Sequence, residues 1–259
     1  MRDQLEEALQ HTQDGYGRAQ HLQQVELPKR FYKDVGVAPF EGGFVVTLDG
    51  RQLRTPGKKV PIILPALSIA QTMAEEWAAQ GEFVDARTMP TTRLINSAVE
   101  SGEEAVPLFR EEIIKFASGD LMLYRADSPQ ELVSHQEVSW DRPLVAISRH
   151  FGVAFQPTIG IIHQQQPQST LDRLAESLTD EGLFVLTALV SITGLTGSGL
   201  LAIAFWSRLI SAEEVWSAAH VDEDFQISQW GEDEEAAERR AKRRAEFDSA
   251  IAVLQAMRP

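Results

Sequence analysis

Residues 43–64 read GFVVTLDGRQLRTPGKKVPIIL, so that apolar runs flank a polar centre. The dipeptide Asp49-Gly50 ends the first run, and Asp-Gly between apolar runs is a strong hairpin signal because the turn needs positive φ at its centre. An earlier run with Phe, Tyr and Val, from Arg30 to Val37, supplies another expected strand. We therefore predict a small antiparallel β unit over residues 29–65.

The hydrophobic period changes after this β unit. From residue 67 onward the apolar residues recur mainly at helical spacing. The run from Phe155 to Ile162 is an exception, because a short continuous apolar run is typical of an extended segment. The last helix is expected to start at Val221 or Glu232 and to end at Met257.

The predicted fold class is α+β, with a small N-terminal antiparallel β domain followed by a larger, mainly α-helical domain. Residues 1–28 are polar and rich in glutamine, and we expect a polar arm or a short helix there. The β-rich domain is predicted over residues 29–90, and the helical domain over residues 91–259.

A long uncharged stretch, from Gly182 to Ser207, is the one place where a membrane span has to be considered. Its length alone would cross a bilayer. Glycines at 194, 197 and 199 cut it into two pieces, each of about eleven residues, which is a length typical of a buried core helix. We therefore predict two buried helices here and no membrane insertion.

The composition narrows the classes of function. The chain has 259 residues and a formal net charge of −14, which argues against nucleic acid and anionic membranes as partners because their phosphates would be repelled. The charge suits a basic client, although solubility alone also accounts for it. The absence of cysteine excludes disulfides, thiol nucleophiles and zinc–thiolate sites. The first ten residues do not read as a secretion signal or a mitochondrial presequence.

No catalytic or metal-binding motif stands out, and the six histidines are scattered. The segment Thr193 to Gly199 resembles a phosphate-binding loop, but no lysine follows it. A helix N-cap at Thr196 or Ser198 explains this segment better. Asp120 and Arg125 are expected to form an ion pair that holds a helix end, and neither a metal nor a cofactor is predicted.

Aromatic residues near the C-terminus are interleaved with acidic residues. The aromatic residues are Trp216, Phe225 and Trp230, and the acids are Asp222, Glu223, Asp224, Glu232, Asp233, Glu234 and Glu235. Such a mixture forms interfaces that anchor apolar groups and steer a basic partner. It also fits aromatic core residues beneath a solvated acidic face, and the residues alone favour this second interpretation.

Several short strings, read in order, resemble those of one family. They are Arg30-Phe31-Tyr32-Lys33, Leu48-Asp49-Gly50-Arg51, Leu53-Arg54-Thr55-Pro56, Glu76-Trp77, Met89-Pro90, Thr92-Arg93-Leu94, Asp120-Leu121, Tyr124-Arg125-Ala126, Thr196-Gly197-Ser198 and Gln229-Trp230-Gly231-Glu232-Asp233. Their number and order, over residues 29–250, make the match specific. The chain resembles the assembly chaperones for the α subunit of the soluble catalytic head of F-type ATP synthase, a family of mitochondria and alphaproteobacteria.

The resemblance implies a small β domain joined to a helical, client-binding domain, with no catalysis and no cofactor. It implies that the client is the free α subunit, and that the chaperone masks the surface of this subunit that faces the β subunit. The functionally important acid of the family, which follows its Trp-Gly motif, falls on Glu234. The client-binding residues expected on this basis are Glu234, Glu238, Trp230, Asp233, Glu232 and Phe225.

Two other functions stay open. A chain of this size usually has a pocket, so an enzyme of unknown type would use a cleft near residues 120–125 together with His163. A permanent scaffold subunit of the final complex is the second alternative. We expect a monomer, because no coiled-coil repeat is present. The resemblance, without a recognisable presequence, points to a bacterial, cytoplasmic member of the family.

Overall fold

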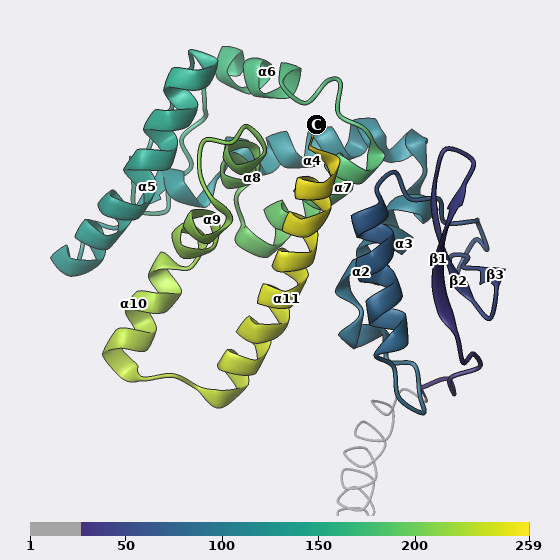
Figure 1. Cartoon of the computed structure of the whole chain (residues 1–259). Coiled ribbons are helices and arrows are strands. Elements are labelled where there is room, and N and C mark those ends of the chain that lie inside the picture. The colour runs from purple at the N-terminus through teal and green to yellow at the C-terminus, as the bar shows by residue number, and fades with distance from the viewer. Residues whose placement is uncertain (1–26, 259) are drawn as a thin grey trace, which may run out of the picture.

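A three-stranded antiparallel sheet lies at one end of the molecule, and helices make up most of the rest (Figure 1). The computed structural model describes residues 27–258. The predicted fold class, α+β with an N-terminal antiparallel sheet, is confirmed. The arm predicted over residues 1–28 lies almost wholly outside the described residues.

Strands come first in the chain, and helices dominate after residue 66. The strands are β1 (Val35–Phe40), β2 (Gly43–Leu48), β3 (Arg51–Gln52), β4 (Tyr124–Arg125) and β5 (Thr158–Ile159). The α-helices are α2 (Leu67–Ala78), α3 (Pro90–Ser101), α4 (Val106–Ser118), α5 (Gln130–Phe151), α6 (Gln168–Glu176), α7 (Leu183–Thr196), α8 (Gly199–Trp206), α9 (Ala212–Ala219), α10 (Val221–Trp230) and α11 (Glu234–Met257). Short 3₁₀ helices are η1 (Ala86–Thr88), η2 (Glu103–Ala105) and η3 (Leu121–Leu123).

The Asp49-Gly50 turn forms as predicted. Both residues have positive φ, 48° and 75°, and they join β2 to β3. The Asp49 carboxylate also accepts hydrogen bonds from the backbone N–H groups of Lys33 and Asp34, at 2.9 and 2.8 Å. One turn therefore fixes both the hairpin and the chain that enters β1.

The first strand begins later than predicted. We expected a strand from Arg30 to Val37, whereas β1 begins at Val35 and continues past Val37 to Phe40. Arg30 lies outside the sheet, because its backbone N–H donates to the carbonyl of Glu82 at 2.8 Å and not to a neighbouring strand. The stretch before β1 therefore crosses to the segment after α2.

Helix α2 connects the sheet to the helical body, since it packs on β1 and β2 and also on α3. The Glu76 carboxylate of α2 accepts hydrogen bonds from the backbone N–H groups of Thr91 and Thr92, both at 2.7 Å. These N–H groups have no partner within α3, because they belong to its first turn. Glu76 thus caps α3 from outside. Because α2 contacts both parts, the division of the chain at residue 90 stays a prediction.

The uncharged stretch forms two helices at the centre of the molecule, as predicted. α7 packs against α3, α4, α8 and α11 (Figure 1). The side chains of Leu186, Leu189 and Ile192 on α7 are fully buried, and α8 is buried up to Phe205. None of the helices in the described part of the chain combines the length and apolar character that a membrane crossing requires.

The N-terminus of α8 packs directly on the backbone of α4. A Cβ atom built on Gly199 would lie 2.8 Å from the backbone nitrogen of Ala117 and still closer to the carbonyl oxygen of Ile113. Only a residue without a side chain allows this approach. Ser198 is the N-cap of α8, since its hydroxyl accepts from the N–H of Leu201 at 2.9 Å. The predicted cap at Thr196 or Ser198 is thus confirmed at Ser198.

Asp120 holds the same helix end from across the chain, so the predicted ion pair with Arg125 is wrong. The fully buried Asp120 carboxylate accepts from the Ser198 hydroxyl at 2.7 Å and from the N–H of Leu200 at 2.9 Å. Arg125 pairs with Asp141 at 2.9 Å instead. The start of α8 offers free N–H groups and a positive dipole end, which attract the carboxylate away from a partly exposed guanidinium.

The C-terminal region contains two helices where one was predicted. α10 ends at Trp230 and α11 begins at Glu234. Gly231 between them has a φ of 85°, a conformation in which an α-helix cannot continue. Of the two expected starting points of the last helix, Glu232 therefore lies close to the observed start and Val221 begins a separate helix.

Candidate functional site

The chain reverses direction between α10 and α11 and forms a projecting corner, seen at the lower left edge of Figure 1. We call residues 230–234 the α10–α11 tip. The indole of Trp230 is 79% exposed there. Asp233 is the N-cap of α11, since its carboxylate accepts from the N–H of Ala236 at 2.8 Å. The tip therefore presents a large aromatic ring to solvent beside a well-formed helix start.

Acidic residues around the tip fall into two groups. In the first group the acids form ion pairs. Asp224 of α10 pairs with Arg240 of α11 at 2.5 Å, and two acids of α11 each pair with the basic residue one turn later in the same helix. These pairs are Glu235 with Arg239 at 2.6 Å and Glu238 with Lys242 at 3.7 Å. Glu232 and Glu234 are exposed and form no ion pair with any other described residue. The tip thus carries negative charge that forms no ion pair with the rest of residues 27–258.

The three aromatic residues of this region are not equivalent. Phe225 is only 8% exposed, and its ring meets that of His135 edge to face at 5.9 Å, so that it holds α10 on α5. Trp216 is also buried, with its ring 4.0 Å from that of His220. The interpretation of core aromatics beneath a solvated acidic face therefore holds for these two. Trp230 alone matches the interface interpretation, and client contact by Phe225 stays a prediction.

Polar contacts connect α10 and α11 to each other and to neighbouring helices. His220, at the start of α10, is buried and its Nδ1 lies 2.7 Å from the carbonyl oxygen of Trp216. Burial lowers the pKa of His220, which favours its neutral form. From α11, Arg243 donates to the carbonyl of Leu195 at 2.9 Å and lies 3.8 Å from Glu223 of α10. The tip is therefore carried on a braced pair of helices.

A groove of about 640 Å³ runs along α11 next to the tip. Its lining includes Pro90, Ala241 and Ala245, together with charged residues that are paired with one another. Glu238 lines this groove, so the groove is continuous with the acidic face near the tip. The family strings Met89-Pro90 and Thr92-Arg93-Leu94 contribute Pro90 and Arg93 to this groove, but nothing in the sequence showed that they meet α11.

The enzyme hypothesis placed a cleft near residues 120–125, and the acid of this segment, Asp120, is not open to a substrate. Asp120 is fully buried and directed at the start of α8. The Tyr124 hydroxyl contacts Nδ1 of His163 at 2.9 Å, and a cavity of about 300 Å³ lies nearby against Arg125 and Asp141. An acid–base pair for catalysis has to reach a substrate. Within residues 27–258, no group of three or more potential metal ligands gathers.

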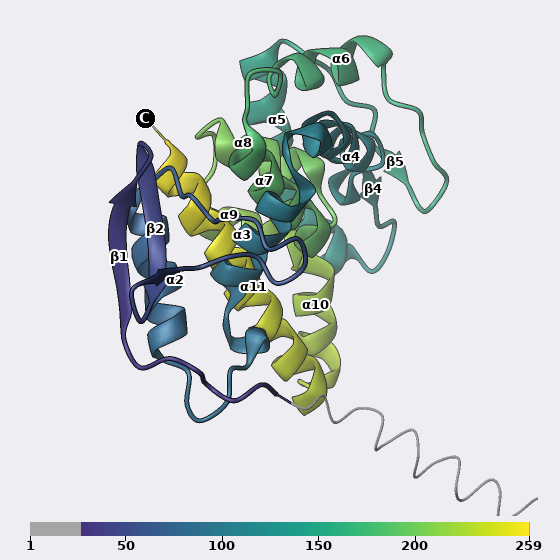
Figure 2. The same ribbon diagram turned by 90° about the vertical axis from the view of Figure 1, so that its right-hand side faces the viewer.

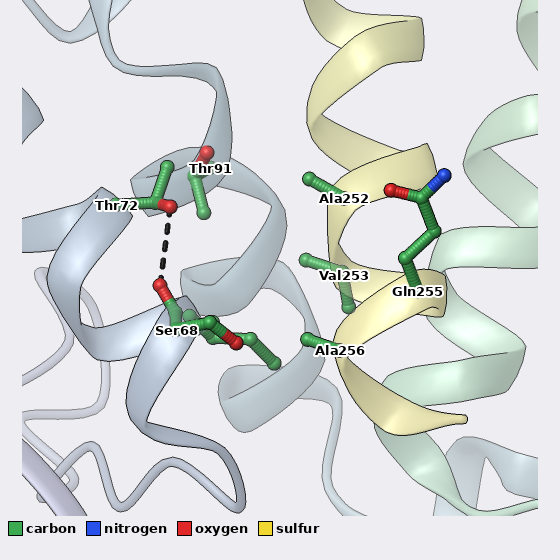
Figure 3. Close-up of a pocket in the computed structure, with 8 residues that line it drawn as sticks. Ser68, Thr72, Thr91, Ala252, Val253, Gln255 and Ala256 are labelled. Atoms are coloured by element: carbon green, nitrogen blue, oxygen red, sulfur yellow. Dashed lines mark hydrogen bonds between the residues drawn. The ribbon is translucent and has the colours of Figure 1, made fainter. Parts of the chain in front are cut away.

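A second groove, of about 370 Å³, separates α2 from the last turns of α11 (Figure 3). Ser68 and Thr72 face it from α2, and Ala252 and Ala256 face it from α11 (Figure 3). Thr72 donates its hydroxyl to the carbonyl of Ser68 at 3.1 Å. The groove is lined by uncharged side chains, and none of the lining residues is an acid or a base that could activate its hydroxyl groups.

Comparison with known proteins identifies the family. The model of the ATP12 chaperone protein family matches residues 29–148. The crystal structure of Atp12 from Paracoccus denitrificans superposes with a TM-score of 0.80 at 35% identity, covering 89% of this chain and 99% of that one. A candidate chaperone from Agrobacterium tumefaciens, Atu1473, superposes with a TM-score of 0.85 at 41% identity, covering 93% of this chain and 90% of that one.

A curated relative extends the comparison to eukaryotes. Mitochondrial protein atp12 of Schizosaccharomyces pombe is 24% identical over 221 residues, which are 81% of this chain and 76% of the yeast protein. The sequence motifs, the fold and these matches agree with one another. The chain belongs to the ATP12 chaperone family.

Proposed function

We propose that this protein is a non-catalytic chaperone of ATP synthase assembly, which binds the free α subunit of the catalytic head and masks the surface that faces the β subunit. Membership of the ATP12 chaperone family supports the chaperone role. The observation that carries the binding site is the α10–α11 tip, where the exposed indole of Trp230 lies beside Glu232 and Glu234, two acids without an ion-pair partner in the part of the chain that the structure describes. An aromatic anchor with adjacent charge is typical of protein interfaces.

The physical need for such a protein follows from the nature of subunit interfaces. A surface that is buried between subunits in a finished complex is apolar, and it aggregates when it is exposed before assembly. A chaperone that covers this surface has only to bind it and then to yield to the β subunit. We therefore propose a one-to-one complex of intermediate affinity, formed by a monomeric chaperone without a cofactor in the bacterial cytoplasm.

Glu234→Lys is expected to weaken binding of the α subunit without unfolding the chaperone. Glu234 is the first residue of α11 and is exposed, so reversing its charge replaces a favourable interaction with the helix dipole by an unfavourable one, each of about 0.3–1 kcal/mol. The steering of a basic client is lost at the same time. The measurement is the yield of soluble α subunit co-purified with each chaperone variant, together with the thermal unfolding midpoint.

Glu103→Lys is the matched control for this variant. Glu103 is also exposed, lies in the first turn of a helix (η2) and forms no ion pair with another described residue. Its location differs from that of Glu234, because it follows Glu100, whose carboxylate accepts from the N–H of Gly57 in the β unit. Both variants change the net charge equally. Equal client capture by a folded Glu234→Lys protein and by the control would remove Glu234 from the binding site.

A further inference from the structure

Three isoleucines project into solvent from the end of β5 and from the segment that follows it. Ile159, Ile161 and Ile162 are 70%, 94% and 78% exposed. The sequence pattern predicted an extended apolar run here, and such a run is normally buried. We call residues 156–166 the isoleucine loop. Its ribbon stands away from the helical body, on the side where β4 and β5 lie (Figure 2).

The base of the isoleucine loop is closed by a buried glutamine. The Gln166 side chain accepts from the N–H of Gln156 at 2.8 Å and donates to the carbonyl of the same residue at 3.0 Å. It also donates to the carbonyl of Gln164 at 3.0 Å. Gln166 is buried, and its amide group is fully used within the loop. The two ends of the loop are therefore held together.

Two further contacts fix the loop to the body of the protein. β5 pairs in parallel with β4, and the N–H of Gly160 donates to the carbonyl of Arg125 at 2.8 Å. Directly after the isoleucines, Nδ1 of His163 lies 2.9 Å from the Tyr124 hydroxyl. Arg125 itself is fixed by Asp141 and by the ring of Trp140, 5.2 Å away. The apolar side chains are thus presented from a braced loop.

The charge pattern indicates what the loop contacts. No Asp, Glu, Lys or Arg occurs in residues 150–171, in a chain with 24 basic and 38 acidic residues. An uncharged apolar patch complements an uncharged apolar surface, because any charge facing it would be desolvated without a partner. A second copy of the chain and an anionic membrane are disfavoured occupants, since both would be repelled by a net charge of −14.

We propose that the isoleucine loop is a second contact site of the chaperone, which covers an apolar, uncharged patch on the α subunit. This inference rests on the proposed function and adds to it a surface that is chemically distinct from the acidic α10–α11 tip. The tip would orient a basic or polar region of the client, and the isoleucine loop would shield apolar surface from water. Burial of exposed aliphatic side chains is favourable without any requirement for direction.

The test is the double variant Ile161→Ser/Ile162→Ser, co-expressed with the α subunit in competition with tagged wild-type chaperone. We expect about 100-fold weaker capture, since burial of each side chain of this size contributes about tenfold or more. The unfolding midpoint is expected to stay unchanged, because both side chains are already exposed in the free protein. The control Leu67→Ser/Leu108→Ser removes exposed leucines from α2 and from the first turn of α4, and it is expected to bind like the wild type.

The outcomes separate this inference from the proposed function. If the wild type captures the α subunit and the isoleucine variant captures it equally, only the isoleucine loop is excluded as a contact site. If the wild type fails to capture the α subunit, both proposals are overturned. If the wild type is a dimer that the isoleucine variant converts to a monomer with unchanged capture, the loop joins two copies of the chain and the proposal is wrong.

Discussion

Gly199→Ala is expected to destabilise the protein by about 3 kcal/mol or more, at the upper end of the cost of overpacking a core. The new methyl group would lie 2.8 Å from the backbone nitrogen of Ala117 and closer still to the carbonyl oxygen of Ile113. These are backbone atoms within α4, so they do not move aside as the end of a flexible side chain does. The change would force α8 away from α4 at the centre of the core.

Gly194→Ala is the matched control for this prediction. Gly194 lies within α7, five residues before Gly199, and a Cβ atom there meets nothing within 4 Å. Alanine is favoured over glycine inside a helix by about 1 kcal/mol, so this variant is expected to be slightly more stable than the wild type. Urea unfolding followed by circular dichroism gives both values. Similar stability of the two variants would show that α8 does not approach α4 as closely as described.

Asp120→Ala is expected to destabilise the protein by about 3 kcal/mol or more, since each buried donor left without an acceptor costs about 1–3 kcal/mol. The Asp120 carboxylate accepts from the Ser198 hydroxyl and from the N–H groups of Leu200 and Met122. Alanine would leave these buried donors unpaired and would open a cavity. Ser198→Ala removes the N-cap side chain and one donor to the Asp120 carboxylate, while the N–H groups of Leu200 and Met122 remain, so the expected cost is smaller, about 2 kcal/mol. Equal stability of the Asp120→Ala variant and the wild type in urea unfolding would contradict this role.

The variant Asp120→Asn tests the effect of the Asp120 charge, because asparagine has nearly the same shape as aspartate but carries no charge. Burial raises the pKa of the Asp120 carboxyl to about 7, although hydrogen bonds from Leu200 and Ser198 oppose this shift. A folded-state pKa above the unfolded value means that the folded protein binds the proton more tightly, so this contribution to stability is present at low pH and is lost as the pH rises through about 7. Asparagine does not titrate. The stability of the wild type relative to Asp120→Asn should therefore fall from about pH 4 to about pH 7 and stay level above that, and a constant difference would contradict the raised pKa.

The parts of the fold that the sequence predicts are those in which the information is local. The Asp49-Gly50 turn needs two residues that tolerate positive φ, and both are adjacent in the chain. The central helices α7 and α8 follow from an uncharged stretch interrupted by glycines. Ser198 is recognisable as an N-cap because it precedes an apolar run.

Contacts between residues far apart in the sequence account for most of the sequence-based predictions that were wrong. Asp120 and Ser198 are separated by 78 residues, and only the packing of α8 on α4 brings them together. The sequence places Asp120 five residues from Arg125, and the nearer, opposite charge was therefore the expected partner. A free helix N-terminus elsewhere in the fold provides the competing site, and this competitor is visible only in three dimensions.

The candidate binding site was found from the sequence only in part. Trp216, Phe225 and Trp230 occur in similar acidic surroundings, yet only Trp230 is exposed, because it is the last residue of α10 and no other helix within residues 27–258 covers it. In the isoleucine loop, by contrast, the sequence suggests burial and the side chains are exposed. Its apolar run resembles a buried strand, whereas contacts from Gln166 and β4 hold it outside the core.

The central claim is tested most directly by co-expressing this protein with the ATP synthase α subunit of the same organism and analysing the soluble fraction by size-exclusion chromatography. We predict a soluble one-to-one complex that dissociates when the β subunit is added, because the β subunit competes for the masked surface. A complex that persists beside the β subunit would favour a permanent scaffold subunit. An α subunit that stays insoluble while this chain elutes alone would contradict the chaperone function.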